Sequence, residues 1–265
     1  METAPARGSA NMAVDEALLR AFQRQGDLPI FRAYRWSPAA ISLGRFQEID
    51  QDIYPKTCVE RGVDIVRRIT GGGAIFHDHE LTYSLVCGRH HLGTMTVKES
   101  FKALCSFLVQ TYRDLGLNAR YALDAAGDDP AIGLKTVHCF AGREPYDILV
   151  DQAKLGGNAQ RRLKDIVFQH GSIPLTLDWQ KQSGLFAAHA LPRPDSVTAL
   201  YTATGKTAAD LLPSTLFTMM KDRFASCMDV QWLDQDLNPA ELAEAEDLRV
   251  NKYESDGWNV RREEG

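Results

Sequence analysis

The chain has 265 residues, of which 44% are hydrophobic and 25% are charged. This composition predicts a folded globular domain and excludes collagen-like, disulfide-scaffold and mainly disordered classes. The net charge of -5 gives no basis for non-specific nucleic-acid binding, and no apolar run approaches the ~20 residues of a membrane helix.

The cysteines are odd in number and widely scattered, at positions 58, 87, 105, 139 and 227. This usage predicts reduced thiols and a cytoplasmic protein rather than a disulfide framework. The opening residues, METAPARGSANMAVDEALL, lack the apolar centre of a signal peptide.

The N-terminal third predicts one helix followed by several strands. Residues 11–25 place apolar side chains along one stripe, which predicts an amphipathic helix with Asn11 as its N-cap. Alternating apolar residues then predict strands, with a break at Ser37-Pro38 and a glycine-rich turn after the third, over the segments 30–36, 39–46, 63–69 and 74–88.

The clearest helix is predicted over residues 97–115. Thr96 and Glu99 have the spacing of a capping box, and Gly116 stands where a helix stop belongs. Residues 124–133 (DAAGDDPAIG) predict a loop, and later segments at 146–151 and 166–175 predict strands.

The chain becomes helical from about residue 194. Asn238-Pro239 followed by Glu241 predicts the start of a late helix. Strands mixed with helices and followed by helices predict an α/β or α+β fold with a central mixed β-sheet flanked by helices. We expect one domain over residues 1–265, with 235–265 as a helical C-terminal tail.

A glycine-rich segment follows two arginines in Arg67-Arg68-Ile69-Thr70-Gly71-Gly72-Gly73-Ala74. Successive glycines allow backbone amides to approach a ligand closely, and arginines supply a fixed positive charge suited to an anion. The pattern is neither a dinucleotide-binding fingerprint nor a P-loop. The alternative is a plain turn between strands with two surface arginines.

A lysine precedes a second glycine pair in Lys154-Leu155-Gly156-Gly157-Asn158. A lysine at such a turn can lie against a ligand carbonyl or phosphate. From these residues alone, a hairpin turn with a solvated lysine is the favoured interpretation.

Cys139 follows the predicted loop in Val137-His138-Cys139-Phe140. A free thiol is a few per cent thiolate at neutral pH, which suffices for a nucleophile once a nearby cation favours the anion. The alternative is a buried structural thiol, which is our expectation for the other four cysteines.

Histidines occur in His77-Asp78-His79 and His90-His91. On a continuous strand His77 and His79 would share a face, but no CxxC or HExxH spacing accompanies either pair. We therefore predict no metal site and favour exposed polar residues or a substrate contact.

Three blocks, in order, resemble the superfamily of lipoate–protein ligases, octanoyltransferases and biotin–protein ligases. They are RRITGGGAIFHDHELTYSL at 67–85, YDILVDQAKLGGNAQRR at 146–162 and FQHGSIPL at 168–175. NMAVDEALL at 11–19 and KYESDGWN at 252–259 are similar to the opening helix and closing tail of that family. The resemblance thus covers nearly the whole chain and implies the family's catalytic-domain fold.

The resemblance also implies a set of site residues. Lys154 would contact the acyl carbonyl or an acyl-adenylate. The remaining substrate-binding residues would be Arg68, Gly71, Gly72, Gly73, His77, Gly156, Gly157 and Asn158.

Within the superfamily, the chain resembles most the branch whose octanoyltransferases use a cysteine. Those enzymes place Cys-Phe, a Tyr-Glu-like pair and Lys-x-x-Gly-x-Ala-Gln in this order. Here Cys139-Phe140, Tyr146-Asp147 and Lys154 to Gln160 fit, with Asp147 in place of the more usual glutamate. Many ligases carry an accessory C-terminal domain, and the thirty or so residues after 235 are too few for one.

This branch implies a reaction, a donor and an acceptor. Cys139 would take an octanoyl or lipoyl group from acyl carrier protein and pass it to a lysine of a lipoyl domain, either glycine-cleavage H protein or a dehydrogenase E2. Lys154 would stabilise the thiolate and the oxyanion. No cofactor is then required, and we expect a monomer. These partners usually present acidic surfaces, so docking through Arg67, Arg161, Arg162 and Lys164 is expected, with an ordinary solvated charge as the alternative for Lys164.

Two other functions stay open from sequence. An ATP- and Mg²⁺-dependent lipoate–protein ligase would use the same glycine turn and Lys154 to hold an acyl-adenylate. A non-catalytic acyl-binding protein on the same fold would bind an octanoyl ligand without turnover.

Overall fold

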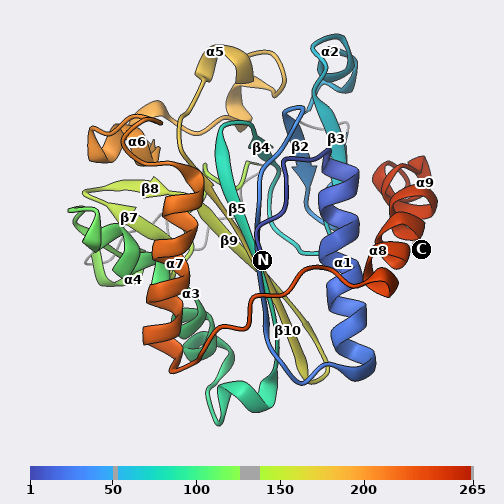
Figure 1. Cartoon of the computed structure of the whole chain (residues 1–265). Coiled ribbons are helices and arrows are strands. Elements are labelled where there is room, and N and C mark those ends of the chain that lie inside the picture. The colour runs from blue at the N-terminus through green and yellow to red at the C-terminus, as the bar shows by residue number, and fades with distance from the viewer. Residues whose placement is uncertain (50–52, 126–137, 264–265) are drawn as a thin grey trace.

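A computed structural model describes residues 1–49, 53–125 and 138–263, and in it the strands form three sheets with helices packed around them (Figure 1). Parallel and antiparallel pairs both occur. The predicted α/β fold with mixed strands flanked by helices is confirmed, with the strands distributed over several sheets.

The first sheet is antiparallel and forms the centre of the molecule. Its order is β1 (Ile30–Tyr34), β5 (Glu80–Gly88), β10 (Ile166–Pro174) and β9 (Gly157–Leu163). All nine residues of β5 are buried because helices cover both faces of the sheet. Alternate side chains point to opposite faces, so that Leu81 and Tyr83 join one core while Val86 joins the other.

The two smaller sheets combine parallel and antiparallel pairs. In one, β2 (Ala40–Leu43) lies between the parallel β3 (Asp64–Arg67) and the antiparallel β4 (Ile75–His77). The other has the order β11 (Val197–Thr198), β8 (Ala153–Leu155), β7 (Ile148–Val150) and β6 (Ala119–Tyr121). A parallel bridge between Ala74, which directly precedes β4, and His138, which precedes β7 in the chain, links the two sheets.

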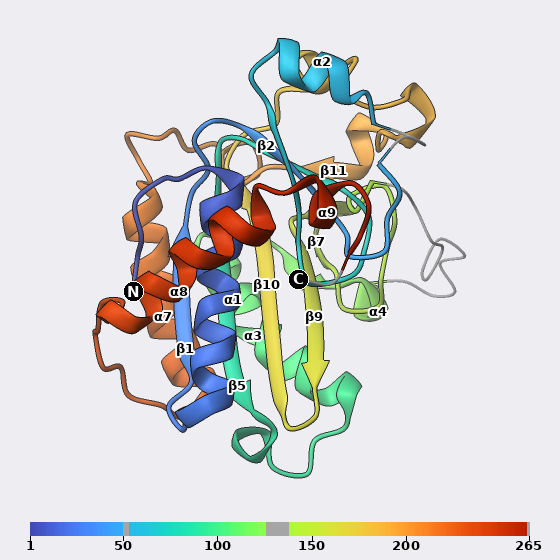
Figure 2. The same ribbon diagram turned by 90° about the vertical axis from the view of Figure 1, so that its right-hand side faces the viewer.

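Helices cover the central sheet on both sides (Figures 1 and 2). One face packs against α3 (Val97–Asp114) and α7 (Pro213–Met228), and the other against α1 (Gly8–Gln25). The remaining helical segments are α2 (Pro55–Glu60), η1 (Arg89–Leu92), α4 (Ala122–Ala125), α5 (Trp179–Gln182), η2 (Ala188–Ala190), η3 (Pro194–Ser196), α6 (Leu200–Thr204), α8 (Pro239–Leu248), η4 (Arg249–Tyr253) and α9 (Asp256–Asn259).

Two of the predicted helix starts are confirmed, and one is wrong. The Thr96–Glu99 capping box opens α3, and Asn238 with Glu241 opens α8. The first helix instead begins at Gly8, and Asn11 lies inside it with its side chain fully buried. Asn11 Nδ2 donates to the carbonyl oxygens of Ala6 and Arg35, so the protein interior rather than the helix terminus uses this amide.

The predicted strand over 74–88 is two strands, because Asp78 and His79 turn the chain between β4 and β5. Helical structure does dominate after residue 194, and the tail helices α8 and α9 lie on the same side of the sheet as α1 (Figure 2). Most of the predicted loop at 124–133 lies outside the described residues. Within the described parts of the chain, none of the helices combines the length and apolar character that crossing a membrane needs.

Candidate active site

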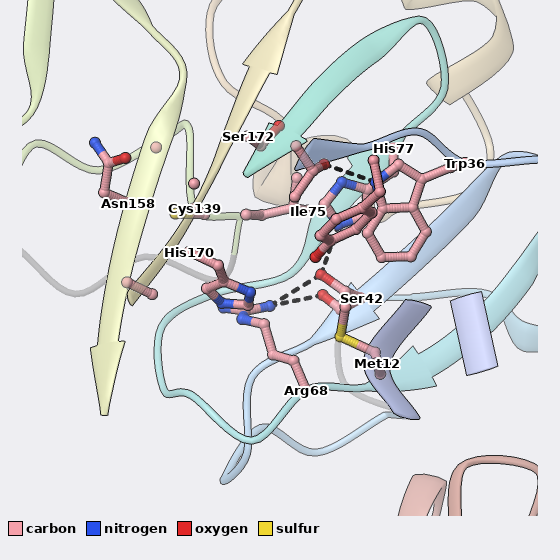
Figure 3. A pocket seen from close by; sticks show the side chains of 15 residues that line it. Met12, Trp36, Ser42, Arg68, Ile75, His77, Cys139, Asn158, His170 and Ser172 are labelled. Carbon is pink, nitrogen blue, oxygen red and sulfur yellow. Dashed lines mark hydrogen bonds between the residues drawn. The ribbon is translucent and has the colours of Figure 1, made fainter. Parts of the chain in front are cut away.

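A small cavity lies between the first half of α1, the β2–β4 sheet and the start of β9 (Figure 3). Predicted site residues that line it are Arg68, His77, Cys139, Gly157 and Asn158. The structure thus brings together side chains from segments that are up to ninety residues apart. The other predicted residues, Gly71–Gly73, Lys154 and Gly156, are not among those that line the cavity.

Arg68 is buried on one wall of this cavity. Its Nε donates to Thr70 Oγ1, its Nη1 to the carbonyl and Oγ of Ser42, and its Nη2 to the carbonyls of Gly71 and Gly73, at 2.7 to 3.2 Å. A guanidinium has five N–H groups, so this set uses all of them on neutral oxygens. Burial lowers the pKa of Arg68 to about 10, and the nearby Cys139 acts in the opposite direction.

The glycine turn exists because its backbone must approach other groups closely. Gly72 has a φ of +93°, which favours glycine, and a Cβ there would lie 3.0 Å from Nη2 of Arg68. A Cβ on Gly44 would lie 1.9 Å from the Gly72 carbonyl oxygen. The turn therefore serves as the frame that holds Arg68, and Gly44 is a further requirement that sequence reasoning missed.

His77 is fixed in the cavity wall by three contacts. Its Nε2 lies 2.7 Å from Ser42 Oγ and its ring stacks on Trp36 at 3.9 Å (Figure 3). Its Nδ1 lies 2.8 Å from Glu80 Oε1. Burial acts to raise the pKa of Glu80, but His77 and the hydroxyls of Thr82 and Ser172 outweigh burial and lower it. The imidazole therefore sits between a carboxylate and a hydroxyl, both at hydrogen-bond distance.

Cys139 begins a turn at the other wall of the cavity. Its N–H donates to the Ala74 carbonyl at 2.9 Å, and its side chain packs with Ile75 and Phe140 while remaining partly exposed. A Cβ added at Gly157 would lie 3.3 Å from Cys139 Sγ and 3.1 Å from the Phe140 ring. The absent side chain of Gly157 is thus what leaves space next to the thiol.

Lys154 lies behind this turn with its side chain 2% exposed. Its Nζ donates to the carbonyls of Cys139 and Gly142 and lies 2.7 Å from Asp147 Oδ2. Burial acts to lower the pKa of Lys154, but the Asp147 carboxylate outweighs this effect and raises it. The lysine is therefore a buried, paired cation whose contacts are with the chain itself.

Two further histidines near the cavity are held neutral. Burial, with Lys154 and His77 adding to it, lowers the pKa of His138 to about 3, and the Phe140 N–H donates to its Nδ1. Burial, with Arg68 and His77 adding to it, places the pKa of His170 well below its usual range. Neither ring adds a positive charge to the site near neutral pH.

Sequence reasoning missed several residues of the cavity wall. His170 lines it, with Nε2 2.7 Å from Thr70 Oγ1, although the FQHGSIPL block had been singled out without assigning this residue. Met12, Trp36 and Ser42 also line it. A histidine on an otherwise apolar strand was a usable signal for His170. Met12 lies in the block 11–19, to which no site residue was assigned, and Trp36 and Ser42 come from segments that carry no motif.

One prediction about surface residues is wrong. Arg67 is fully buried, since its guanidinium donates to carbonyls of Gly44, Gln47, Trp258 and Asn259, and it therefore cannot dock a partner. Lys164 is exposed, whereas Arg161 and Arg162 are half-buried.

The expectation of four buried structural thiols holds for three of them. All five cysteines are free, and Cys227 is exposed. Burial raises the pKa values of Cys58 and Cys87 to about 11 and that of Cys105 to about 12, which makes these thiols poor nucleophiles. Cys139 is the one cysteine that lines the cavity.

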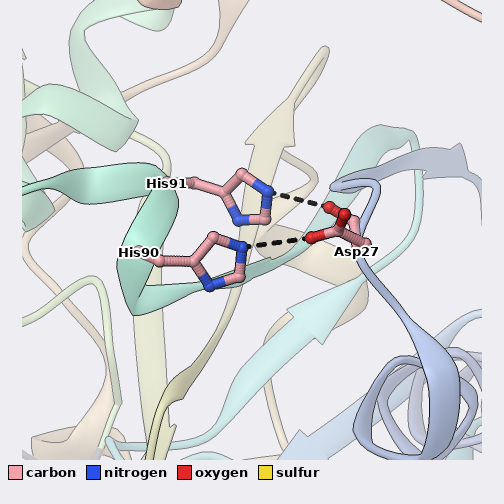
Figure 4. A group of neighbouring side chains, drawn as sticks. All are labelled: Asp27, His90 and His91. Carbon is pink, nitrogen blue, oxygen red and sulfur yellow. Dashed lines mark hydrogen bonds and ion pairs between the residues drawn. The ribbon is translucent and has the colours of Figure 1, made fainter.

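Of the two histidine pairs, His77 alone lines the cavity, and His79, His90 and His91 are exposed, as expected for polar surface residues. His77 is buried and His79 is exposed, because the strand ends between them, so the two do not share a face. His90 and His91 instead lie beside Asp27 at the surface, with possible ligand atoms within 4.8 Å of one another (Figure 4). Both ring nitrogens of His91 are engaged, with the Gly88 N–H and the Asp27 carbonyl, and His90 and Asp27 are largely exposed.

The family follows from comparison with known proteins. A family model described as the lipoyl protein ligase A/B catalytic domain matches residues 7–209, and the chain belongs to this family. Among its relatives, octanoyltransferase LipM of Bacillus subtilis is 32% identical over 262 residues, covering 95% of this chain and 94% of the relative. Octanoyltransferase LipM of Kyrpidia tusciae is 33% identical over 268 residues, covering 97% and 96%.

Solved structures show the same fold. A putative lipoate protein ligase from T. acidophilum with bound lipoic acid aligns with a TM-score of 0.79 at 23% identity, covering 98% of this chain and 96% of that one. A lipoate-protein ligase A bound with ATP aligns equally well, with the same coverage and TM-score. The family and fold that the sequence resemblance implied are thereby confirmed.

Proposed function

We propose that this enzyme is an octanoyltransferase that carries the acyl group on Cys139 and delivers it to a lysine of a lipoyl-domain protein. The observation that carries the proposal is a partly exposed thiol in a cavity next to a buried guanidinium, in a chain whose relatives are named octanoyltransferases. A cation near a thiol favours the thiolate, which is the reactive form.

The transfer proceeds in two exchanges. The Cys139 thiolate attacks the thioester carbonyl of the donor, the new S–C bond forms, and the donor thiolate leaves. The neutral amine of the acceptor lysine then attacks the Cys139 thioester, an amide forms, the Cys139 thiolate leaves and the amine loses a proton. Because the donor is already activated, neither exchange consumes ATP.

The cavity offers apolar surface for an acyl chain. Met12, Trp36 and Ile75 line it together with the Tyr34 ring. At ~0.8 kcal/mol for each buried CH₂, enclosing most of an octanoyl chain contributes up to roughly 5 kcal/mol. Polar groups of Ser42, Thr82 and His77 occupy other parts of the wall, where they are hydrogen-bonded within the protein.

The partners of this proposal are those that the family resemblance implies. The donor is octanoyl-acyl carrier protein, and the acceptor is a lipoyl domain of glycine-cleavage H protein or of a dehydrogenase E2. The protein acts as a monomer in the cytoplasm, in keeping with its five free thiols. The direct contact between Lys154 and the acyl carbonyl, like the ligand contacts of Gly71–Gly73, Gly156 and Asn158, stays a prediction from the resemblance.

Intact-protein mass spectrometry tests the proposal. The protein is mixed with octanoyl-acyl carrier protein without ATP or acceptor, and the expected result is one octanoyl adduct that maps to Cys139. Transfer that appears only with lipoate, ATP and Mg²⁺ would identify a ligase instead. Tight binding of an octanoyl ligand with no adduct and no turnover under either condition would identify an acyl-binding protein.

A further inference from the structure

The strand β3 lies at the edge of its sheet and ends at Arg67. On the inner side, β3 pairs with β2, and the N–H of Arg68 donates to the carbonyl of Leu43. On the outer side, the N–H of Arg67 donates to Asn259 Oδ1, and the carbonyl of Arg67 accepts the Trp258 Nε1–H, both at 2.8 Å. Two side chains of the C-terminal tail thus satisfy backbone groups that a further strand would otherwise pair.

The buried guanidinium of Arg67 joins the tail to the loop after β2. Its Nη1 donates to the carbonyls of Gly44 and Gln47, both at 2.7 Å. Its Nε and Nη2 donate to the carbonyls of Trp258 and Asn259 at 3.0 and 2.7 Å. Because a guanidinium presents its donors as a planar fork, one side chain can hold two segments together in this way.

The loop 44–47 in turn lies against the glycine turn 71–73. The N–H of Arg45 donates to the carbonyl of Thr70 at 2.8 Å, and a Cβ on Gly44 would lie 1.9 Å from a carbonyl oxygen of the turn. Two carbonyls of the same turn accept hydrogen bonds from Arg68, which lines the cavity. Because these backbones are in direct contact, a displacement of the loop displaces the cavity wall.

The tail is itself fixed by the helix α1. Lys252 Nζ lies 2.9 Å from Glu16 Oε2 and 4.0 Å from the centre of the Trp258 ring, and the Tyr253 hydroxyl donates to Glu16 at 2.5 Å. Asn259 Nδ2 donates to the carbonyl of Tyr253 at 2.7 Å. Both side chains that contact the backbone of β3 are therefore anchored to the body of the protein.

We propose that Trp258 and Asn259 are positioning residues of the active site, which hold Arg67 and, through it, the loop 44–47 against the glycine turn. This inference rests on the proposed function, in which the acyl group enters the cavity that Arg68 lines. None of the described tail residues 235–263 lines that cavity, so the tail acts on acyl transfer through Arg67.

A pair of substitutions at Asn259 separates hydrogen bonding from shape. Asn259→Leu has a similar size and removes the acceptor for the Arg67 N–H. Asn259→Asp keeps an oxygen for that N–H, next to a guanidinium that compensates the added charge. The matched control is Asn251→Leu, the same substitution at an exposed position of the tail whose side chain contacts Asp247.

Three rates are measured for each protein. The first is single-turnover acylation by saturating octanoyl-acyl carrier protein. The second is alkylation of Cys139 by iodoacetamide, a small reagent that needs no acyl-binding wall. The third is alkylation of Cys58, which is fully buried beside the sheet of β3 and becomes reactive only when this part of the protein opens.

Asn259→Leu is expected to slow acylation about 10- to 100-fold, because a displacement of about 1 Å in a site can cost a factor of this size. Asn259→Asp is expected to acylate faster than Asn259→Leu, and Asn251→Leu is expected to keep the wild-type rate. Alkylation of Cys139 and Cys58 is expected to stay at the wild-type rate in all three variants, because the tail acts on the acyl-binding wall and not on folding or on the thiol.

Trp258→Phe keeps the test open if Asn259→Leu does not fold. This variant retains a ring over Lys252 and removes one N–H, and it is expected to slow acylation about 2- to 10-fold, the range of one hydrogen bond.

Four results would overturn the inference: wild-type acylation in Trp258→Phe, equal slowing in Asn259→Leu and Asn259→Asp, an equal loss of Cys139 alkylation, or slower acylation accompanied by faster alkylation of Cys58. Failure of the proposed function is separate, because it shows as a missing adduct on the wild-type protein.

Discussion

The two walls of the cavity each bury a cation, and they treat its charge in opposite ways. Arg68 is surrounded by carbonyl and hydroxyl oxygens, and burial lowers its pKa to about 10. Lys154 adjoins the carboxylate of Asp147, which outweighs burial and raises its pKa. A buried charge can be stabilised by a counter-ion or by dipoles, and only a counter-ion cancels the net charge of the group and its partner.

The two walls therefore differ in how their buried cations are held. On the Arg68 wall, the glycine turn orients carbonyls around a charge. On the Lys154 wall, a neutral pair orients a turn that carries the thiol. Substitutions can disrupt one wall at a time, and the Cys139 thiol lies between the two walls.

Removal of the thiol has the largest expected effect, since both walls serve it. Cys139→Ala should reduce acyl transfer by a factor of about 10⁴ or more, as loss of a nucleophile does in other acyl-transfer enzymes. Cys227→Ala, which removes an exposed thiol, serves as control and should transfer at the wild-type rate. Thermal unfolding checks that both variants fold, and full activity of Cys139→Ala would refute the nucleophile assignment.

Breaking the Arg68 wall comes next. Arg68→Gln leaves several buried oxygens without donors, which should lower the free energy of unfolding by about 3–5 kcal/mol, and loss of the charge should slow acylation 10²- to 10³-fold. Arg68→Lys keeps the charge and should retain more acylation at a similar cost in stability. Chemical denaturation and single-turnover acylation measure the two effects, and equal acylation rates for the two variants would show that the charge is not what matters.

The Lys154 wall can be disrupted through shape alone by the substitution Gly157→Ala. Gly157→Ala places a methyl group 3.3 Å from Cys139 Sγ and 3.1 Å from the Phe140 ring, so the turn must shift, and acylation should fall by up to about 100-fold. Gly62→Ala is the control, because a Cβ there meets nothing within 4 Å and the φ of +66° affects stability only. An unchanged rate in Gly157→Ala would show that the thiol does not need its present position.

Sequence reasoning succeeded where the physics is local. Thr96 with Glu99 and Asn238 with Glu241 satisfy helix N–H groups within one turn, so their spacing alone predicts two helix starts. Sequence reasoning failed where contacts between distant segments determine whether a side chain is buried. Arg67 and Arg68 are adjacent, yet Arg67 is buried by the tail residues Trp258 and Asn259. The sequence around Arg67 contains no signal for this contact.

The candidate site shows the same limit. The family resemblance predicted one site for Arg68 and Cys139, because the order of its blocks carries long-range information, and both residues line the same cavity. It did not show where the N–H groups of Lys154 point, because that depends on partners seven to fifteen residues earlier in the chain. Side-chain direction is a property of the packed fold, and it decides whether a cation acts on a ligand or on the protein.

The smallest expected effect concerns the pH dependence of stability, which arises from His138 on the Lys154 wall. The pKa of His138 is lowered to about 3 by burial and by Lys154, whereas an unfolded histidine titrates near ~6.5. Between these pH values the unfolded chain binds more protons than the folded chain. The contribution of His138 to the free energy of unfolding is therefore fully present above about pH 6.5 and is lost as the pH decreases. At ~1.4 kcal/mol per pH unit, His138 alone should lower the free energy of unfolding by about 2 kcal/mol at pH 5.

His138→Asn keeps an acceptor for the Phe140 N–H but cannot titrate. The loss of stability between pH 7 and pH 5, measured by chemical denaturation, should therefore shrink by about 2 kcal/mol in this variant. The exposed His90 provides the control, since His90→Asn should leave the loss unchanged. If His138→Asn loses as much stability as wild type, then water reaches the imidazole when it is protonated, and the Lys154 wall is less tightly closed than its contacts indicate.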